Sequence, residues 1–162
     1  MYQNGKPELS VITGTAGVGK SGLVKEIYKP ISAARGYLIS GEYEQYTKNL
    51  PFSGIIKAFS NLIRILLTET PEEIDNRKKR IESQLGSNAK IVMDVIPQLE
   101  LIIGEQQQVT TLDSQENSNR FYSVFQNFIR VFCTLNHPLI LFLDDMQWAD
   151  TASLQMIKNL MT

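Results

Sequence analysis

The feature that most limits what this chain can fold into is a glycine-rich stretch close to its N-terminus. Residues 14–21 read GTAGVGKS and match the pattern G-x-x-x-x-G-K-[ST] at every fixed position. The apolar run at residues 8–13 predicts a buried strand before this stretch. Leu23, Val24 and Ile27 recur at helical spacing after it. The stretch is therefore predicted to be a loop that joins a strand to a helix, which is the context in which this pattern binds phosphate.

The glycines of such a loop let the backbone turn tightly and point its N–H groups into an anion-sized nest at a helix N-terminus. Lys20 is then expected to reach the β- and γ-phosphates of a nucleotide, and the Ser21 hydroxyl to contact Mg²⁺. A glycine-rich turn without a ligand is the alternative, and the flanking strand and helix patterns argue against it. The expected nucleotide-binding residues are Gly14, Thr15, Ala16, Gly17, Val18, Gly19, Lys20, Ser21 and Gly22.

The composition is that of an ordinary soluble domain. The chain has 162 residues, of which 43% are hydrophobic and 20% charged. Because 16 basic residues face 17 acidic ones, neither nucleic acid nor an anionic membrane is an expected partner. The chain has one cysteine, a polar N-terminus without the apolar centre of a signal peptide, and no apolar run long enough to span a membrane. These features predict a cytoplasmic protein.

Two further strands are predicted, at residues 37–41 and 139–144. A helix at residues 19–28 would connect the first two strands into a parallel, right-handed βαβ unit. Between the second and third strands the pattern is mostly helical over a length far beyond a minimal crossover. The chain is therefore expected to be an α/β protein with three parts: a βαβ unit at 1–46, a helical insertion at 47–136, and a strand and helix at 137–162.

Within the helical insertion, an apolar stripe predicts a helix over residues 55–67, and Thr70 with Pro71 restarts a charged helix. The basic run of that helix is interpreted as a solvated face. Pro97 interrupts the apolar stretch that follows, and residues 105–119 are predicted to form a polar loop.

The most regular helical pattern lies at residues 121–132, where four phenylalanines share one stripe. This stripe could stack nucleic-acid bases, but aromatic residues at helical spacing favour burial in the core. Cys133 is expected to fill space in the core, and His137, in the loop before the last strand, is assigned no catalytic role.

Two carboxylates, Asp144 and Asp145, follow the last predicted strand, whose apolar run indicates burial on both faces. Open α/β sheets bind ligands at this end of their strands. Asp144 is expected to hold Mg²⁺ through water or through Ser21, and Asp145 to polarise the attacking water. The alternative is helix capping, because aspartate readily caps a helix of the kind that is predicted to start near Asp150.

With these residues in view, the chain resembles AAA-type ATPases of the signal-transduction (STAND) class. Residues 14–21 correspond to the Walker A motif, residues 141–145 to Walker B, and residues 147–150 (QWAD) to the segment after it. Residues 37–41, 95–104 and 119–121 add a likeness to the ATPase module of bacterial, especially cyanobacterial, multi-sensor serine/threonine and histidine kinases.

The resemblance implies a P-loop NTPase fold with a three-layer parallel sheet, ATP and Mg²⁺ as cofactors, and neighbouring kinase and sensor domains in the same polypeptide. It also implies a further strand, ending in a polar sensor residue, between the Walker A and Walker B strands. No such strand follows Walker B before Thr162, so the fold is expected to be truncated, with the two Walker strands either paired directly or separated by a gap. Asp145 stands where motor-type relatives carry glutamate, which argues against vigorous hydrolysis.

Three functions follow from this pattern. A nucleotide-dependent switch in a larger sensor kinase is the leading hypothesis, with Lys20 and Asp145 as the catalytic residues if ATP is hydrolysed. There are two alternatives: an active ATP hydrolase or remodeller, and an interaction scaffold with little turnover. A small-molecule P-loop kinase is less favoured, because the sequence shows no pattern for an acceptor pocket. ATP is preferred over GTP through the resemblance, and the oligomeric state, including a homo-oligomer, stays open.

Overall fold

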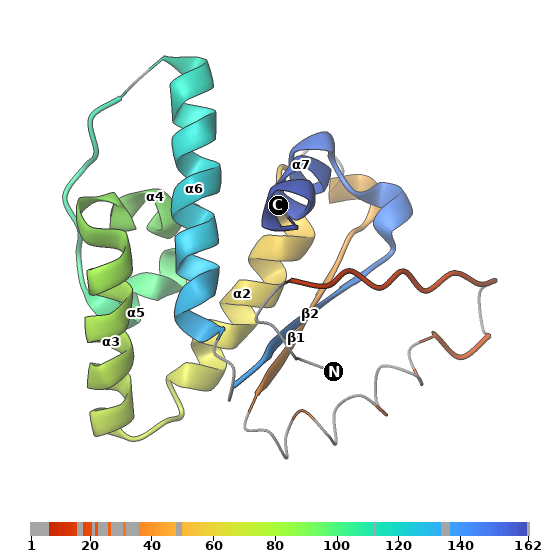
Figure 1. Cartoon of the computed structure of the whole chain (residues 1–162), viewed down its shortest axis with the longest axis horizontal. Helices are drawn as coiled ribbons and strands as arrows, with labels where there is room; N and C mark the ends of the chain where they lie inside the picture. The colour runs from red at the N-terminus through yellow and green to blue at the C-terminus, as the bar shows by residue number, and fades with distance from the viewer. Residues whose placement is uncertain are drawn as a thin grey trace.

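The computed structural model describes most of the chain from Pro7 to Met161 as strands, helices and short connections (Figure 1). The described residues are 7–15, 18–20, 22, 26, 31, 36–47, 50–111, 113–133 and 137–161. The strands are β1 (Tyr37–Glu42) and β2 (Leu139–Asp144), and the α-helices are α2 (Ser53–Leu66), α3 (Pro71–Leu85), α4 (Ala89–Met93), α5 (Glu100–Ile103), α6 (Ser114–Phe132) and α7 (Thr151–Leu160). Short 3₁₀ turns are η1 (Gln45–Thr47), η2 (Gly86–Asn88), η3 (Pro97–Leu99) and η4 (Met146–Trp148). Among the described helices, none is long and apolar enough to cross a membrane.

The two strands pair directly in a parallel sheet; parallel strands were predicted, but the direct pairing of these two was not. The register places Tyr37 opposite Leu139 and Glu42 opposite Asp144. Strand β2 is only half-buried along its length, so the prediction of burial on both faces is wrong. Its alternate residues, Leu139, Leu141 and Leu143, pack against the helical core.

The predicted strand at residues 8–13 is not formed. The stretch is extended but belongs to no sheet (Figure 1), and Leu9 and Val11 are 61% and 76% exposed. An apolar run becomes a strand only when a neighbour accepts its backbone hydrogen bonds. Strand β2 takes β1 as its partner in this structure, and no described strand pairs with residues 8–13. The Walker A and Walker B strands were expected either to pair directly or to be separated by a gap. The prediction of direct pairing is therefore wrong.

Helix α2 lies against β1 and carries the largest share of the core. Figure 1 shows α3 to α6 grouped on one side of α2 and the sheet on the other. The approach between β1 and α2 is close, because a Cβ atom at Gly41 would collide with the carbonyl oxygen of Gly54. The buried residues of α2 are Gly54, Ile55, Ala58, Phe59, Ser60, Leu62, Ile63 and Leu66.

Helix α6 packs against α3 and α4 through the predicted phenylalanine stripe. Phe125, Phe128 and Phe132 are each at most 1% exposed, and Phe59 of α2 makes ring contacts with the first two, at centroid distances of 5.5 and 5.6 Å. The stripe is thus core, as expected, and offers no stacking platform. The helix begins at Ser114, inside the predicted loop at 105–119.

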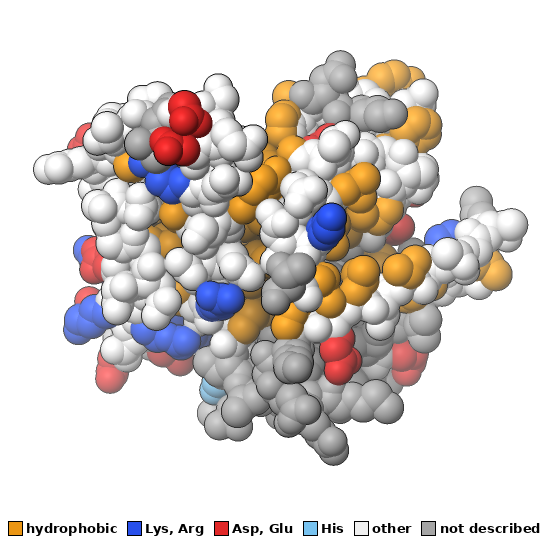
Figure 2. Space-filling model, turned by 45° about the horizontal axis from the view of Figure 1, so that its top comes forward, with side chains coloured by type: hydrophobic (Ala, Val, Ile, Leu, Met, Phe, Trp, Pro, Cys, Tyr) orange, Lys and Arg blue, Asp and Glu red, His pale blue; other side chains and the backbone are white. Residues whose placement is uncertain are grey.

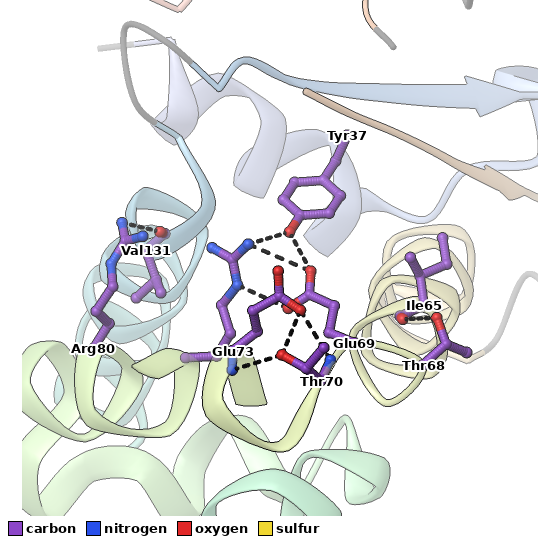
Figure 3. Close-up of polar contacts among 9 residues, drawn as sticks. Tyr37, Ile65, Thr68, Glu69, Thr70, Glu73, Arg80 and Val131 are labelled. Carbon is purple, nitrogen blue, oxygen red and sulfur yellow. Dashed lines mark hydrogen bonds and ion pairs between the residues drawn. The ribbon is translucent and has the colours of Figure 1, made fainter. Parts of the chain in front are cut away.

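A polar cluster ties the start of β1 to the helices (Figure 3). The Tyr37 hydroxyl donates to Glu69 Oε1 at 3.0 Å and accepts from Arg77 Nη2 at 2.6 Å, while Arg77 Nε donates to Glu69 Oε2 at 3.2 Å. Beside it, Thr70 and Glu73 form a reciprocal capping box at the start of α3. The predicted restart at Thr70 is confirmed, and Arg77 departs from the predicted solvated face because it is part of this cluster.

One smaller prediction is wrong. Cys133 is exposed at the end of α6, because that position follows the last buried turn. In α7, Leu154 is 49% exposed, whereas Met156 is fully buried and Ile157 and Leu160 pack against the core.

Candidate functional site

The glycine-rich loop is described at Gly14, Thr15, residues 18–20 and Gly22. Lys20 Nζ donates hydrogen bonds to the carbonyl oxygens of Gly14 at 3.0 Å and Thr15 at 3.1 Å. These bonds are exposed, so the ammonium can exchange them for a phosphate at little cost in desolvation. Ala16, Gly17 and Ser21 lie outside the described residues.

At one position, the backbone of the loop adopts a conformation that is accessible mainly to glycine. Gly19 has φ 95°, in the left-handed region that residues with a Cβ atom rarely adopt. Its carbonyl oxygen accepts from Gly22 N at 2.9 Å, and Val18 N donates to Thr15 O at 3.4 Å. Lys20, Gly22 and Glu26 are helical, in keeping with the predicted helix after the loop, whose other residues lie outside the described part of the chain.

The second predicted group of residues lies at the carboxyl end of β2. Asp144 is the last residue of the strand, and its Oδ1 accepts from the backbone N–H of Asp145 at 2.9 Å. Asp145 is exposed and has φ 53°, and its Oδ1 accepts from Gln147 Nε2 at 2.8 Å. The left-handed backbone at Asp145 turns the chain sharply into η4. Neither carboxylate caps a helix, so the capping alternative applies to Asp150 alone.

Further charges surround this end of the sheet. Glu42 ends β1 opposite Asp144, and Lys57 of α2 pairs with Glu42 at 3.2 Å and with Glu44 at 3.6 Å. The Glu42 carboxylate, whose charge acts first through its hydrogen bond to Lys57, raises the pKa of that lysine. Lys57 is therefore held in its charged form and neutralises one carboxylate beside Asp144. The sequence pattern alone had not pointed to this pair.

The residues could hold a nucleotide-bound metal, although a metal site built of protein groups alone is not found. Among the described residues, no three His, Cys, Asp or Glu side chains gather around one point. Mg²⁺ in nucleotide sites takes one or two protein ligands and fills its remaining positions with water and phosphate oxygens. Asp144 fits that requirement, since its Oδ2 accepts no hydrogen bond within the described part of the chain.

Among the described residues, no direct contact joins the glycine-rich loop to the carboxylates at the end of β2. The described hydrogen bonds of Lys20 stay within its own loop, and those of the Asp144 and Asp145 side chains stay within the turn after β2. Their approach would depend on residues 16, 17 and 21 and on a ligand between them. The grouping of these residues into one site therefore stays a prediction.

Asp150 has a role that the sequence pattern reveals only in part. Its Oδ1 accepts from Ser153 N at 2.9 Å, which is the expected N-cap of α7. Its Oδ2 accepts from Ser153 Oγ at 2.5 Å and from the backbone N–H of Phe52 at 3.1 Å. The bond to Phe52 spans 98 positions in the sequence, and no local pattern signals it.

An α/β fold with a parallel sheet, a glycine-rich loop containing lysine and carboxylates at the carboxyl end of a strand are the features of an ATPase domain. The chain belongs to the AAA ATPase domain family, whose model matches residues 2–162.

Among curated proteins it is similar to "Hybrid signal transduction histidine kinase G" of Dictyostelium discoideum, with 41% identity over 157 residues. The match covers 97% of this chain but 4% of the relative. The chain thus corresponds to a small part of that protein. No solved structure matches the chain at a significant level.

Proposed function

We propose that this chain is a nucleotide-dependent switch that binds Mg-ATP and is read by neighbouring domains of a larger sensor kinase. The observation that carries the proposal is the glycine-rich stretch with Lys20 in a member of the AAA ATPase domain family. The similarity to a hybrid histidine kinase supports kinase and sensor domains as the neighbours. The whole relative is far longer, so these partners, a cytoplasmic location and a homo-oligomer belong to the proposal.

Each residue has a defined part in this proposal. The backbone N–H groups of residues 14–22 bind the phosphates, and Lys20 exchanges its carbonyl partners for the β- and γ-phosphate oxygens. Ser21 and Asp144 are the residues that would hold Mg²⁺, which neutralises phosphate charge when bound. Asp145 would orient the attacking water.

Hydrolysis is expected to be slow. The Asp145 carboxylate is engaged by Gln147 at 2.8 Å, so one of its oxygens already has a partner when a water molecule approaches. In the family resemblance, glutamate is usual here, and aspartate is shorter by one methylene. Both features favour a nucleotide-held state over rapid turnover.

The division of the chain is part of the same proposal. Residues 1–46 and 137–162 would form part of a P-loop NTPase sheet with its helices, and residues 47–136 a helical insertion between its second strand and its Walker B strand. The insertion would be the surface that neighbouring domains contact, because α3 to α6 pack together on one side of α2 (Figure 1).

The experiment combines thermal unfolding with γ-phosphate release from Mg-ATP. A switch is stabilised by Mg-ATP, by about 2.7 kcal/mol at a nucleotide concentration of about 100 times Kd, and releases little phosphate. An active hydrolase or remodeller shows stabilisation with sustained release. An interaction scaffold shows neither effect, and that result would reject the nucleotide role.

A further inference from the structure

The Asp150 carboxylate joins two segments that are remote in sequence. One of its oxygens caps α7 through Ser153 N at 2.9 Å, and the other accepts from Phe52 N at 3.1 Å. A single carboxyl oxygen is sufficient for an N-cap. The second oxygen, which also accepts from Ser153 Oγ, can therefore hold the residue that precedes α2.

The residue held in this way has an unusual backbone. Phe52 has φ 63° and ψ 15°, in the left-handed region, and is the N-cap of α2 without a side-chain cap of its own. A bulky residue rarely adopts this conformation unless its surroundings enforce it. The hydrogen bond from Phe52 N to Asp150 is one such constraint.

The ring of Phe52 packs against two aromatic residues of α6. Its centroid lies 4.9 Å from that of Phe121 and 6.4 Å from that of Tyr122. Phe121 in turn contacts Phe125 of the core stripe at 5.7 Å. The position of Phe52 is thus coupled by packing to the helix that contacts α3 and α4.

On its other side, Asp150 belongs to a tightly bonded turn at residues 144–150, here called the β2 turn. Trp148 N donates to Asp145 O at 2.9 Å, and Ala149 N donates to Met146 O at 3.1 Å. With so many local bonds the β2 turn is expected to move as one unit. A displacement at Asp145 would therefore reach Asp150.

Tyr43 lies where the end of β1, the β2 turn and the start of α7 meet. Its backbone N–H donates to Asp144 O at 3.2 Å, and its side chain is 1% exposed. Burial raises the pKa of the Tyr43 hydroxyl, the neighbouring Ser153 partly offsets that rise, and the negative charge of Asp150 adds to it. The end of β1, the β2 turn and the start of α7 therefore share one buried contact region.

We propose that Asp150 is a positioning residue that fixes the β2 turn to the first turn of α2, and so transmits nucleotide occupancy at Asp144 and Asp145 to α6. The link itself follows from the hydrogen bonds of Asp150. Only the transmission of nucleotide occupancy rests on the proposed function.

Amide hydrogen exchange without nucleotide tests the link. Asparagine caps helices as well as aspartate but has one acceptor oxygen, so Asp150→Asn keeps the α7 cap and loses the bond to Phe52. We expect the Phe52 amide to exchange about tenfold faster or more, because the bond accepted by a carboxylate is lost. The Ser153 amide should keep its protection.

Asp113→Asn is the matched control. Asp113 caps α6 by accepting from Glu116 N at 2.8 Å, and its recorded cap contact is local. It should leave exchange at Phe52 unchanged. Ser153→Ala removes one bond to Asp150 but spares the bond to Phe52, so it should also leave Phe52 protected. Equal loss of protection at Phe52 and Ser153 in Asp150→Asn, or no change at Phe52, would overturn the link.

A second arm adds Mg-ATP and follows both ends of the link. The single tryptophan, Trp148, lies in the β2 turn and reports events there by its fluorescence. In the parent chain we expect Mg-ATP to change both Trp148 emission and exchange at Phe52 and Phe121. In Asp150→Asn only the Trp148 response should remain. Persistence of the response at Phe121 in this variant would overturn transmission.

Failure of the proposed function gives a different result. If Mg-ATP changes neither Trp148 emission nor exchange in the parent chain, nucleotide binding is wrong and transmission of occupancy falls with it. The comparison without nucleotide then still decides whether Asp150 fixes the β2 turn to α2. If Asp150→Asn does not fold, exchange in the parent chain decides: protection of the Phe52 amide comparable to that of Ser153 supports the link, and fast exchange at Phe52 overturns it.

Discussion

Asp144 and Asp145 are neighbours in the chain, but their surroundings suit them to different tasks. The Asp144 side chain accepts one local bond, and among the described residues none donates to its other oxygen, at the end of a half-buried strand. The Asp145 side chain is exposed, projects from a left-handed backbone and is engaged by Gln147. These surroundings support the proposal that Asp144 holds the metal and Asp145 orients the water.

Asp144→Asn is predicted to weaken binding of Mg-ATP more than binding of metal-free ATP, because the carboxylate acts on the ion and not directly on the phosphates. Titrations with and without Mg²⁺ measure the two affinities. Asp94→Asn, a change at an exposed carboxylate of the α4 C-cap, is the control and should alter neither affinity. Equal losses with and without metal would make Asp144 a structural residue.

Tyr37 gives a prediction about alkaline stability. Burial, partly offset by the charge of Arg77 and reinforced by Glu69, raises the pKa of Tyr37 to about 12 from its ordinary value of 10.0. The unfolded chain therefore loses this proton at lower pH than the folded chain does. The contribution of Tyr37 to stability is complete below pH 10 and falls as the pH rises from there toward 12.

Urea unfolding at several pH values measures this effect. Tyr37→Phe should be less stable than the parent chain near neutral pH, because the hydrogen bonds with Glu69 and Arg77 are lost, and the difference should narrow above pH 10. Tyr46→Phe, at a residue 94% exposed, should follow the parent curve. A constant difference across the range would contradict the assignment.

At the scale of elements, β1 and α2 approach each other closely at a pair of glycines. Gly41 in β1 faces the backbone of Gly54, and Gly54 in turn leaves room for the Tyr43 ring, 2.8 Å from where a Cβ would stand. Neither position has space for a methyl group. The small residues here set how near the helix lies to the sheet.

Gly41→Ala is therefore predicted to destabilise the chain by about 1–3 kcal/mol or more, since overpacking against backbone cannot be relieved by side-chain rotation. Ser40→Ala, at the exposed neighbouring position of β1, should change the free energy of unfolding by less than about 0.5 kcal/mol. Chemical denaturation measures both values. Similar stabilities for the two variants would mean that α2 can shift away from β1.

The elements that sequence reasoning predicted are those whose signals are local. Strands β1 and β2 follow from short apolar runs, and the start of α3 follows from Thr70 and Pro71. The start of α6 was missed because its first turns are polar and show no apolar stripe. Asp113 followed by Glu116 was an available capping signal at that point.

What sequence reasoning could not supply depends on distant partners. The run at residues 8–13 has the composition of a strand, but its state is decided by whether another strand pairs with it. The bond between Asp150 and Phe52 likewise joins residues that no short-range pattern relates. For the candidate site, the glycine-rich loop and the two carboxylates were readable, and the contacts of Asp145 with Gln147 and of Lys57 with Glu42 were not.

At the scale of the whole molecule, the helices and the glycine-rich loop occupy separate regions. The buried core lies mainly among α2, α3, α4 and α6 and the inner face of the sheet. The extended segment at 7–15 contributes exposed apolar residues, and Figure 2 shows hydrophobic side chains open to solvent on one face of the molecule. Changes in the loop should therefore alter ligand binding with little effect on the folded core.

The nucleotide site is tested most directly by a calorimetric titration of the chain with Mg-ATP, extended to millimolar nucleotide. We predict saturable binding to the parent chain and its loss in Lys20→Ala, whose described hydrogen bonds are confined to the loop carbonyls of Gly14 and Thr15. Lys79→Ala, at an exposed lysine of α3, should bind as the parent does. Binding that persists unchanged in Lys20→Ala, or no binding to the parent chain, would contradict the central claim that residues 14–22 form a nucleotide site.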